Sequence, residues 1–258
     1  MNNIFSLKRF AILFKKHTIE HYKGYLMSLG VLFGLLAISF GSSVFKSKMP
    51  VSIGNQMINY IVCLLLSGTI FTSNVFNNLG DKRKTIATLT LPASIFEKYM
   101  VGWVYSYLIF QILFTALFYA LLFIISIMGN WPAGSVHYLD LFSADQKVYF
   151  VFPGYIILHA ITLYGAIYFK KMHFIKTASS LFIIGLILWV LNDQVLEAVM
   201  GVKISGNPPF GGLSFNQNNQ FYNLEMGDMY FKWTIILFMV LSAILWAASY
   251  FRLKEKQV

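Results

Sequence analysis

The most informative polar residues of this chain lie in one segment, residues 77–100, between two long apolar runs. It contains three consecutive cations at positions 82–84, a helix-breaking Pro92 and the pair Glu97-Lys98. A short polar element joined to a membrane span on each side can pass a rigid-body movement into both spans. The segment is therefore a candidate docking site for a soluble protein.

Familiar catalytic motifs are missing from the sequence. There is no G-x-x-x-x-G-K-[ST] phosphate-binding loop, so any nucleotide hydrolysis has to come from another polypeptide. The patterns G-x-S-x-G and H-E-x-x-H are absent as well. We therefore predict that the chain is not an enzyme, has no catalytic residues and binds no cofactor of its own.

One short stretch, His17-Thr18-Ile19-Glu20-His21, matches the H-x-x-E-H pattern of a group of metallopeptidases. Two histidines four residues apart lie on one face of a helix and could bind zinc. The match is only five residues long, however, and it falls on a predicted surface helix in a chain without a soluble catalytic domain. We interpret these residues as interfacial histidines and predict no metal site.

The composition indicates an integral membrane protein. The chain has 258 residues, of which 57% are hydrophobic and 12% are charged, whereas ordinary globular chains have about 25% charged residues. Apolar runs long enough to cross a bilayer as helices occur six times. The predicted fold is thus all-α, with spans at about 25–45, 57–76, 101–128, 149–169, 177–192 and 232–251.

Two further elements complete the prediction. Residues 1–24 form an amphipathic cytoplasmic helix at the interface, ahead of a six-span transmembrane domain at 25–258, because Ile4, Leu7 and Phe14 share one helical face. The long outer segment 193–231, which is rich in Gly and Pro, is predicted to re-enter the membrane. Within it, residues 195–200 are expected to form a separate short helix.

The distribution of charge predicts the topology. If the N-terminus is cytoplasmic, residues 1–24, 77–100, 170–176 and 252–258 lie inside and contain fifteen of the 20 Lys and Arg. This bias follows the positive-inside rule, so both termini are expected in the cytoplasm. The net charge of +10 then reflects cations that meet anionic lipid headgroups, and nucleic-acid binding is not predicted.

Polar side chains are rare inside the predicted spans. No Asp, Glu, Lys or Arg lies deep in any of them, which argues against an ion-coupled carrier or a proton pump. The notable polar residues are Asn59, Gln111 and His159. They are expected to form hydrogen bonds between helices, with the alternative that they line a substrate pathway.

The polar segment also resembles a known family. Asn78-Leu79-Gly80, Leu91-Pro92-Ala93-Ser94, Glu97-Lys98 and the ending 250–256 are similar to ABC-2-type ABC transporter permeases, particularly those of Bacteroidota-like bacteria. The resemblance implies a dimer of permeases, either two copies or a copy and a paralogue, in a bacterial inner membrane with a separate ATP-hydrolysing subunit. It also implies that Leu79 to Lys98 form a coupling helix that binds this ATPase, with the contact on Leu89, Leu91, Pro92, Ser94, Ile95, Glu97 and Lys98.

The residues themselves agree with a break in this segment. Leu91 precedes a proline and is therefore biased away from helix, while Pro92 is tolerated in a first helical turn with Thr90 as its cap. The expected function is an exporter permease. The alternatives are a non-transporting assembly or sensory protein that docks a partner through the same segment, and, third, a membrane-embedded enzyme. Nothing in the sequence selects a substrate.

Overall fold

The fold was analysed in a computed structural model of the whole chain. The residues that the structure describes are 5–76, 93–129, 131–132, 134–143, 146–169, 171–201, 206–207, 209, 212–217, 220–224 and 227–256.

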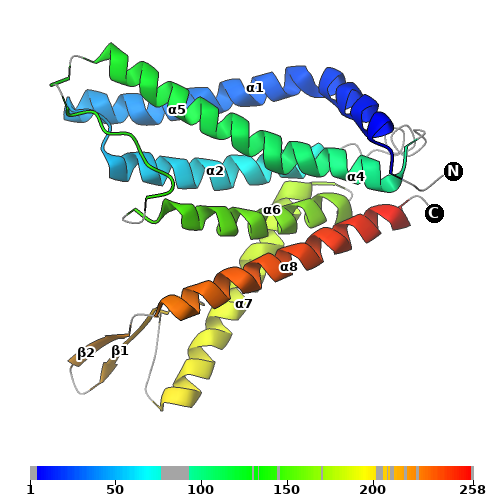
Figure 1. Cartoon of the computed structure of the whole chain (residues 1–258). Helices are drawn as coiled ribbons and strands as arrows, with labels where there is room; N and C mark the ends of the chain where they lie inside the picture. The colour runs from blue at the N-terminus through cyan, green and yellow to red at the C-terminus, as the bar shows by residue number, and fades with distance from the viewer. Residues whose placement is uncertain are drawn as a thin grey trace.

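The chain is a multi-pass membrane protein built almost entirely of helices (Figure 1). Among the described residues, six helical segments are long and apolar enough to cross a membrane. Each of the six predicted spans overlaps one of them, with 57–76 and 149–169 running one residue past its end, which confirms the six-helix prediction. The segments are α1 (Leu7–Ser47), α2 (Ile53–Val75), the run Ile95–Met128, the run Val148–Tyr168, α7 (His173–Met200) and α8 (Asp228–Glu255).

The first helix is longer than the sequence suggested. Residues 7–24 of the predicted interfacial helix and the predicted first span at 25–45 are parts of one 41-residue helix, α1. Gly24 does not interrupt it, because a single glycine costs a helix interior only about 1 kcal/mol. Figure 1 shows that the first turns of α1 change direction relative to the rest of the helix. The interfacial position of these turns stays a prediction.

The third span contains a change of helical type. It begins at Ile95, earlier than the predicted residue 101, and consists of α4 (Ile95–Trp103), a π-helical segment η2 (Val104–Ile109) and α5 (Phe110–Met128). The fourth span opens with a single 3-10 turn, η3 (Val148–Phe150), and continues as α6 (Val151–Tyr168). Short π segments inside α-helices are uncommon and are frequent at functional sites.

The segment 193–231 differs from the prediction in two respects. Residues 195–200 are not a separate helix, because α7 continues through Asn192 and Asp193 and ends at Gly201, which has φ +66°. A glycine with positive φ is a common helix terminator. In addition, β1 (Leu213–Gln217) pairs antiparallel with β2 (Gln220–Leu224), with Leu213 opposite Leu224. The all-α prediction missed this hairpin.

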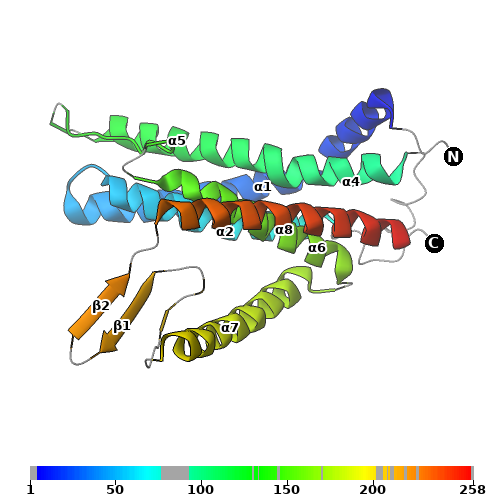
Figure 2. The ribbon, with the colours of Figure 1, turned by 60° about the horizontal axis from the view of Figure 1, so that its bottom comes forward.

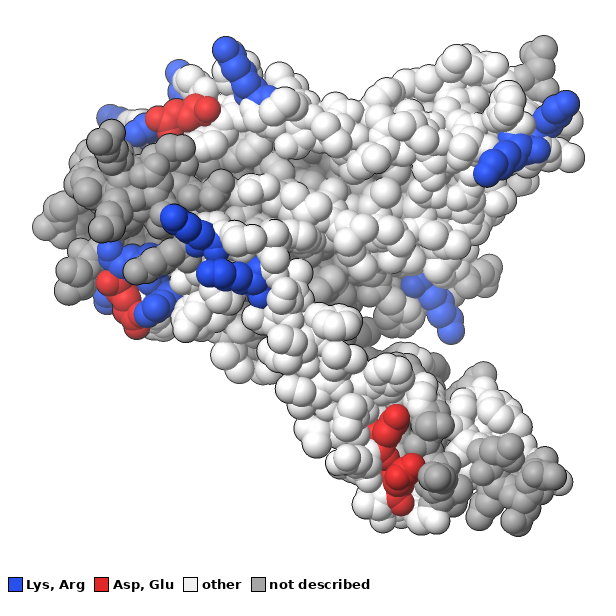
Figure 3. All heavy atoms as spheres, turned by 180° about the vertical axis from the view of Figure 1, so that it is seen from behind, with Lys and Arg blue, Asp and Glu red and all other residues white. Residues whose placement is uncertain are grey.

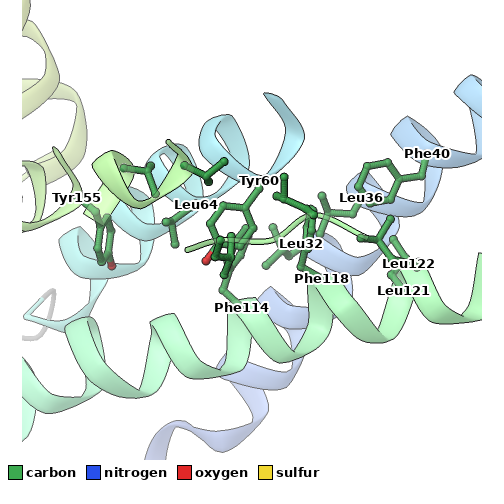
Figure 4. Packing of buried hydrophobic residues seen from close by; sticks show 14 of the residues in the cluster. Leu32, Leu36, Phe40, Tyr60, Leu64, Phe114, Phe118, Leu121, Leu122 and Tyr155 are labelled. Atoms are coloured by element: carbon green, nitrogen blue, oxygen red, sulfur yellow. The ribbon is translucent and has the colours of Figure 1, made fainter. Parts of the chain in front are cut away.

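The largest apolar cluster joins α1, α2, α5 and α6 (Figure 4). Phe110, Phe114 and Phe118 lie four residues apart on α5, so their rings stack along one face, at centroid separations of 6.1 Å and 6.3 Å. Tyr60 of α2 meets Phe114 and Phe118 edge to face at 5.3 Å and 5.0 Å. Helices in a membrane associate largely through such close packing, so these contacts hold the bundle together.

The helix α7 stands apart from this bundle. In both Figure 1 and Figure 2 it leaves the end of α6 and diverges from α8 toward the β1–β2 hairpin. Its contacts are made at its start, where Thr177 is 5% exposed and packs against Gly165 of α6. The same figures show that α1 begins and α8 ends at one end of the molecule, as an even number of spans requires.

Candidate functional site

The start of α4 carries the best-defined part of the predicted docking segment. Ser94 is the N-cap of α4, and its hydroxyl accepts a hydrogen bond from the Glu97 backbone N–H at 3.2 Å. In return, the Ser94 backbone N–H donates to Oε2 of Glu97 at 2.8 Å. This reciprocal capping box satisfies two backbone donors that the helix cannot pair internally.

The second oxygen of the same carboxylate binds the start of α1. Oε1 of Glu97 accepts hydrogen bonds from the Ser6 backbone N–H at 2.8 Å and from Arg9 Nε and Nη2 at 3.2 Å and 3.0 Å. The Glu97 side chain is completely covered, and that of Arg9 is 35% exposed. Charge-assisted hydrogen bonds are about twice as strong as neutral ones. We call this arrangement the Glu97 junction: Ser6, Arg9, Ser94 and Glu97.

The Glu97 junction joins the two helix starts mechanically. Ser6 is the N-cap of α1 and has no side-chain capping hydrogen bond of its own, so the Glu97 carboxylate supplies a cap to α1 as well as to α4. The two helix starts are therefore fixed to each other through one side chain.

The predicted contact residues differ in their accessibility. Leu89, Leu91 and Pro92 lie outside the described residues. Ser94, Glu97 and Lys98 are buried, and Ile95 is half-buried. The contact of these four residues with a partner stays a prediction.

The most accessible side chain of this stretch is one that the sequence analysis did not select. Phe96 is 43% exposed. Its ring meets Phe5 at 5.8 Å and Tyr250 of α8 at 6.0 Å. Phe96 thus links the beginning of α1, the beginning of α4 and the end of α8 on one surface. The capping-box pattern at 94–97 could have revealed the helix start, but no sequence signal points to Arg9, which is 88 residues away.

A second polar cluster holds the π segment in the core. The indole N–H of Trp246 donates to Nδ1 of His159 at 3.2 Å, and Nε2 of His159 lies 2.9 Å from the Ser106 hydroxyl. Because an indole can only donate, Nδ1 is the acceptor, and we assign the proton of a neutral ring to Nε2, which donates to Ser106. Ser106 then donates to the carbonyl of Gly102 at 2.8 Å.

The fourth member of this cluster supports the unusual backbone. The Tyr155 hydroxyl donates to the carbonyl of Ser106 at 3.2 Å, within the π segment. Ser106, Tyr155 and His159 are each 4% exposed or less. We call Ser106, Tyr155, His159 and Trp246 the His159 cluster. These hydrogen bonds link α6 and α8 to the π segment η2, which lies between α4 and α5.

The three polar residues predicted inside the spans do not meet at one place. His159 belongs to the cluster just described. Asn59 of α2 accepts a hydrogen bond from Ser39 of α1 at 2.6 Å and donates to Asn55. Gln111 lies half-buried in the first turn of α5. Asn59 and His159 thus form hydrogen bonds between helices, and a role in lining a pathway stays a prediction for all three.

The histidines of the H-x-x-E-H stretch pack among aromatic rings. His17 and His21 stack at 4.4 Å, and Nε2 of His17 lies 2.6 Å from the Tyr25 hydroxyl. Glu20 faces Lys16 at 3.6 Å. Within the described part of the chain, no group of three or more His, Cys, Asp or Glu is arranged to hold a metal ion.

Comparison with known proteins gives no match to any family model, curated protein or solved structure. The chemistry of the site therefore has to be inferred from its geometry. Its polar groups form hydrogen bonds with one another at helix starts and helix crossings. These bonds fix the helices relative to one another.

Proposed function

We propose that this chain is the membrane-spanning permease subunit of an exporter that is driven by a separate ATP-hydrolysing subunit. The observation that carries the proposal is the Glu97 junction, in which one covered carboxylate joins the starts of α1 and α4. The absence of a phosphate-binding loop from the sequence assigns ATP hydrolysis to the partner.

The proposed mechanism is a rigid-body movement. The ATPase binds the segment around the start of α4, with Ile95 and Phe96 offering the accessible surface. Because the Glu97 junction ties α4 to α1, the movement reaches two spans at once. The π segment follows α4 directly, and the His159 cluster connects it to α6 and α8.

The orientation and assembly are part of the same proposal. The termini lie in the cytoplasm of a bacterium, the chain resides in the inner membrane, and a second permease copy or a paralogue completes the complex. The positive-inside bias supports this orientation. In Figure 3, Lys and Arg gather at the end where α1 begins and α8 ends.

Affinity purification from the native host tests the proposal. The tagged chain is expected to recover an ATP-binding-cassette subunit, whose rate of ATP hydrolysis in the reconstituted complex rises with exported substrate. Purification that never recovers such a subunit would refute the proposal. A recovered partner without substrate-dependent hydrolysis would instead favour the non-transporting docking protein.

A further inference from the structure

Cations from two distant parts of the sequence meet where α7 leaves α6. The turn between α6 and α7 and the first turn of α7 contribute Lys171 and Lys176, and the last turns of α8 contribute three more. The helix α6 packs against both α7 and α8, which brings these stretches together. We call the set the cationic cluster: Lys171, Lys176, Arg252, Lys254 and Lys256.

Two aromatic rings at the end of α6 organise the cationic cluster. The guanidinium carbon of Arg252 lies 5.1 Å from the centre of the Tyr168 ring, and Nζ of Lys176 lies 5.8 Å from that of Phe169. These two rings are neighbours, with centroids 5.3 Å apart. Cations placed over aromatic faces keep a defined position, so Arg252 and Lys176 frame one small area.

The charge of this area is only partly balanced. Nη1 of Arg252 pairs with Glu255 at 2.5 Å. The Nε atom of Arg252 is shielded from solvent and finds no hydrogen-bond acceptor within the described ranges. Lys171, Lys176 and Lys254 are exposed. Among the described residues, the area therefore has a surplus of positive charge, which suits a phosphate group.

An apolar surface continues from the cationic cluster. None of the described residues 178–200 of α7 is buried, and large side chains such as Phe182 (68% exposed) and Ile187 (52% exposed) lie open. On α8, Ile244 is 58% and Phe251 is 57% exposed. The ribbons of α7 and α8 diverge from their common neighbour α6 (Figure 2), and we call the region between these two helices, which begins at the cationic cluster, the wedge.

We propose that this wedge is a binding site for one anionic phospholipid. The phosphate lies against Arg252, Lys176 and Lys256, and the acyl chains run along the apolar sides of α7 and α8. A phospholipid fits better than free phosphate because the donors and the apolar surface are continuous. The proposal does not depend on the function proposed above.

Native mass spectrometry tests the site with the full-length chain in nanodiscs of equal parts phosphatidylglycerol and phosphatidylcholine. The test variant is Lys176→Gln/Arg252→Gln/Lys256→Gln. The matched control is Lys8→Gln/Lys15→Gln/Lys23→Gln, which removes the same charge from α1. A third variant, Lys176→Arg/Lys256→Arg, retains the charge and shows whether binding survives when only the side-chain shape changes.

The wild type is expected to retain phosphatidylglycerol in preference to phosphatidylcholine. Since a juxtamembrane cation contributes about 1 kcal/mol, or about fivefold, the triple test variant should lower this preference on the order of a hundredfold. The control variant and the arginine variant should keep the wild-type preference for phosphatidylglycerol. Equal losses in the test and control variants would overturn the site.

Two other results would also overturn it. Displacement of the lipid by inorganic phosphate alone would show that the cations bind a free anion rather than a phospholipid. A lipid-free dimer, in which α7 becomes protected from hydrogen exchange, would show that a second copy of the chain occupies the wedge.

Discussion

The start of α4 and the helix α7 differ in how their positions are fixed. At the start of α4, Ser94, Glu97 and Lys98 are buried, and the Glu97 carboxylate binds groups on two helices. Along α7, the described residues beyond Thr177 are half-buried or exposed, and almost all of the large ones are apolar. One region is fixed by internal partners, and the other depends on what surrounds it.

This difference indicates which region is expected to transmit a movement and which is expected to bind lipid or another chain. A polar junction that is covered and fully bonded has one stable geometry, so it transmits movement. An exposed apolar helix has no internal partner to choose its position, so lipid or another chain sets it. Matched pairs of substitutions, one in the fixed part and one in α7 or at an exposed position, should separate the two kinds of region.

The largest effect is expected from truncating the core. Leu163 of α6 is fully buried, and Leu163→Ala should lower the free energy of unfolding in detergent by about 3 kcal/mol because it leaves a cavity. Leu188 of α7 is 48% exposed, and Leu188→Ala should change it by less than about 0.5 kcal/mol. Equal effects, measured by denaturant titration, would show that α7 is packed in the isolated chain.

The Glu97 junction comes next. Glu97→Ala removes the acceptor for Ser6, Arg9 and Ser94, and should destabilise the chain by about 2 kcal/mol. Glu20→Ala is the matched control because Glu20 is 53% exposed and pairs only with Lys16; its cost should stay below about 0.5 kcal/mol. Hydrogen exchange at residues 6–12 should increase only in the Glu97 variant, and unchanged exchange would contradict the junction.

Adding a methyl group tests the contact between the start of α7 and α6. A Cβ on Gly165 would lie 2.0 Å from the Thr177 hydroxyl oxygen, so Gly165→Ala should cost about 1.5 kcal/mol through overpacking. Gly185 of α7 has no other atoms near the position of a Cβ, and Gly185→Ala should be neutral or slightly stabilising. Thermal unfolding monitored by circular dichroism compares the two.

The smallest effect is expected at the π segment. Ser106→Ala removes the acceptor for His159 and should cost about 1 kcal/mol. Ser180→Ala on α7 is the control, since Ser180 bonds only the carbonyl of Lys176 in its own helix. A change in indole fluorescence of Trp246 should accompany the loss at Ser106, because His159 accepts its N–H. An unchanged spectrum would argue against the assigned chain of hydrogen bonds.

Much of the fold followed from the sequence. Six apolar runs predicted six helices because lipid leaves the backbone no other way to pair its amides. The ends of the helices were less predictable: Asn192 and Asp193 did not stop α7, since Asn192 finds a partner in the Asn207 carbonyl at 3.2 Å. The β1–β2 hairpin was missed because proline and glycine dominate its surroundings and hide two five-residue strands.

Two residues of the polar clusters were named from the sequence. Glu97 was selected as part of the predicted partner contact, and His159 was selected as a polar residue inside a span. Their partners were not, since Arg9 and Trp246 are 88 and 87 residues away along the chain, and no local pattern encodes such pairs. The π segment also gave no signal, because the side chains that bond Ser106 from α6, His159 and Tyr155, are 53 and 49 residues away along the chain.

The central claim, that a partner ATPase acts through the start of α4, is tested most directly by the conservative pair Glu97→Gln and Glu20→Gln. Both are purified from the native host, and the ATPase recovered per chain and its rate of ATP hydrolysis are measured. Glu97→Gln is expected to remain in the membrane but to recover less ATPase, or an ATPase with a lower rate of ATP hydrolysis. Glu20→Gln is expected to match the wild type in both quantities. Wild-type recovery and hydrolysis in both variants would contradict it.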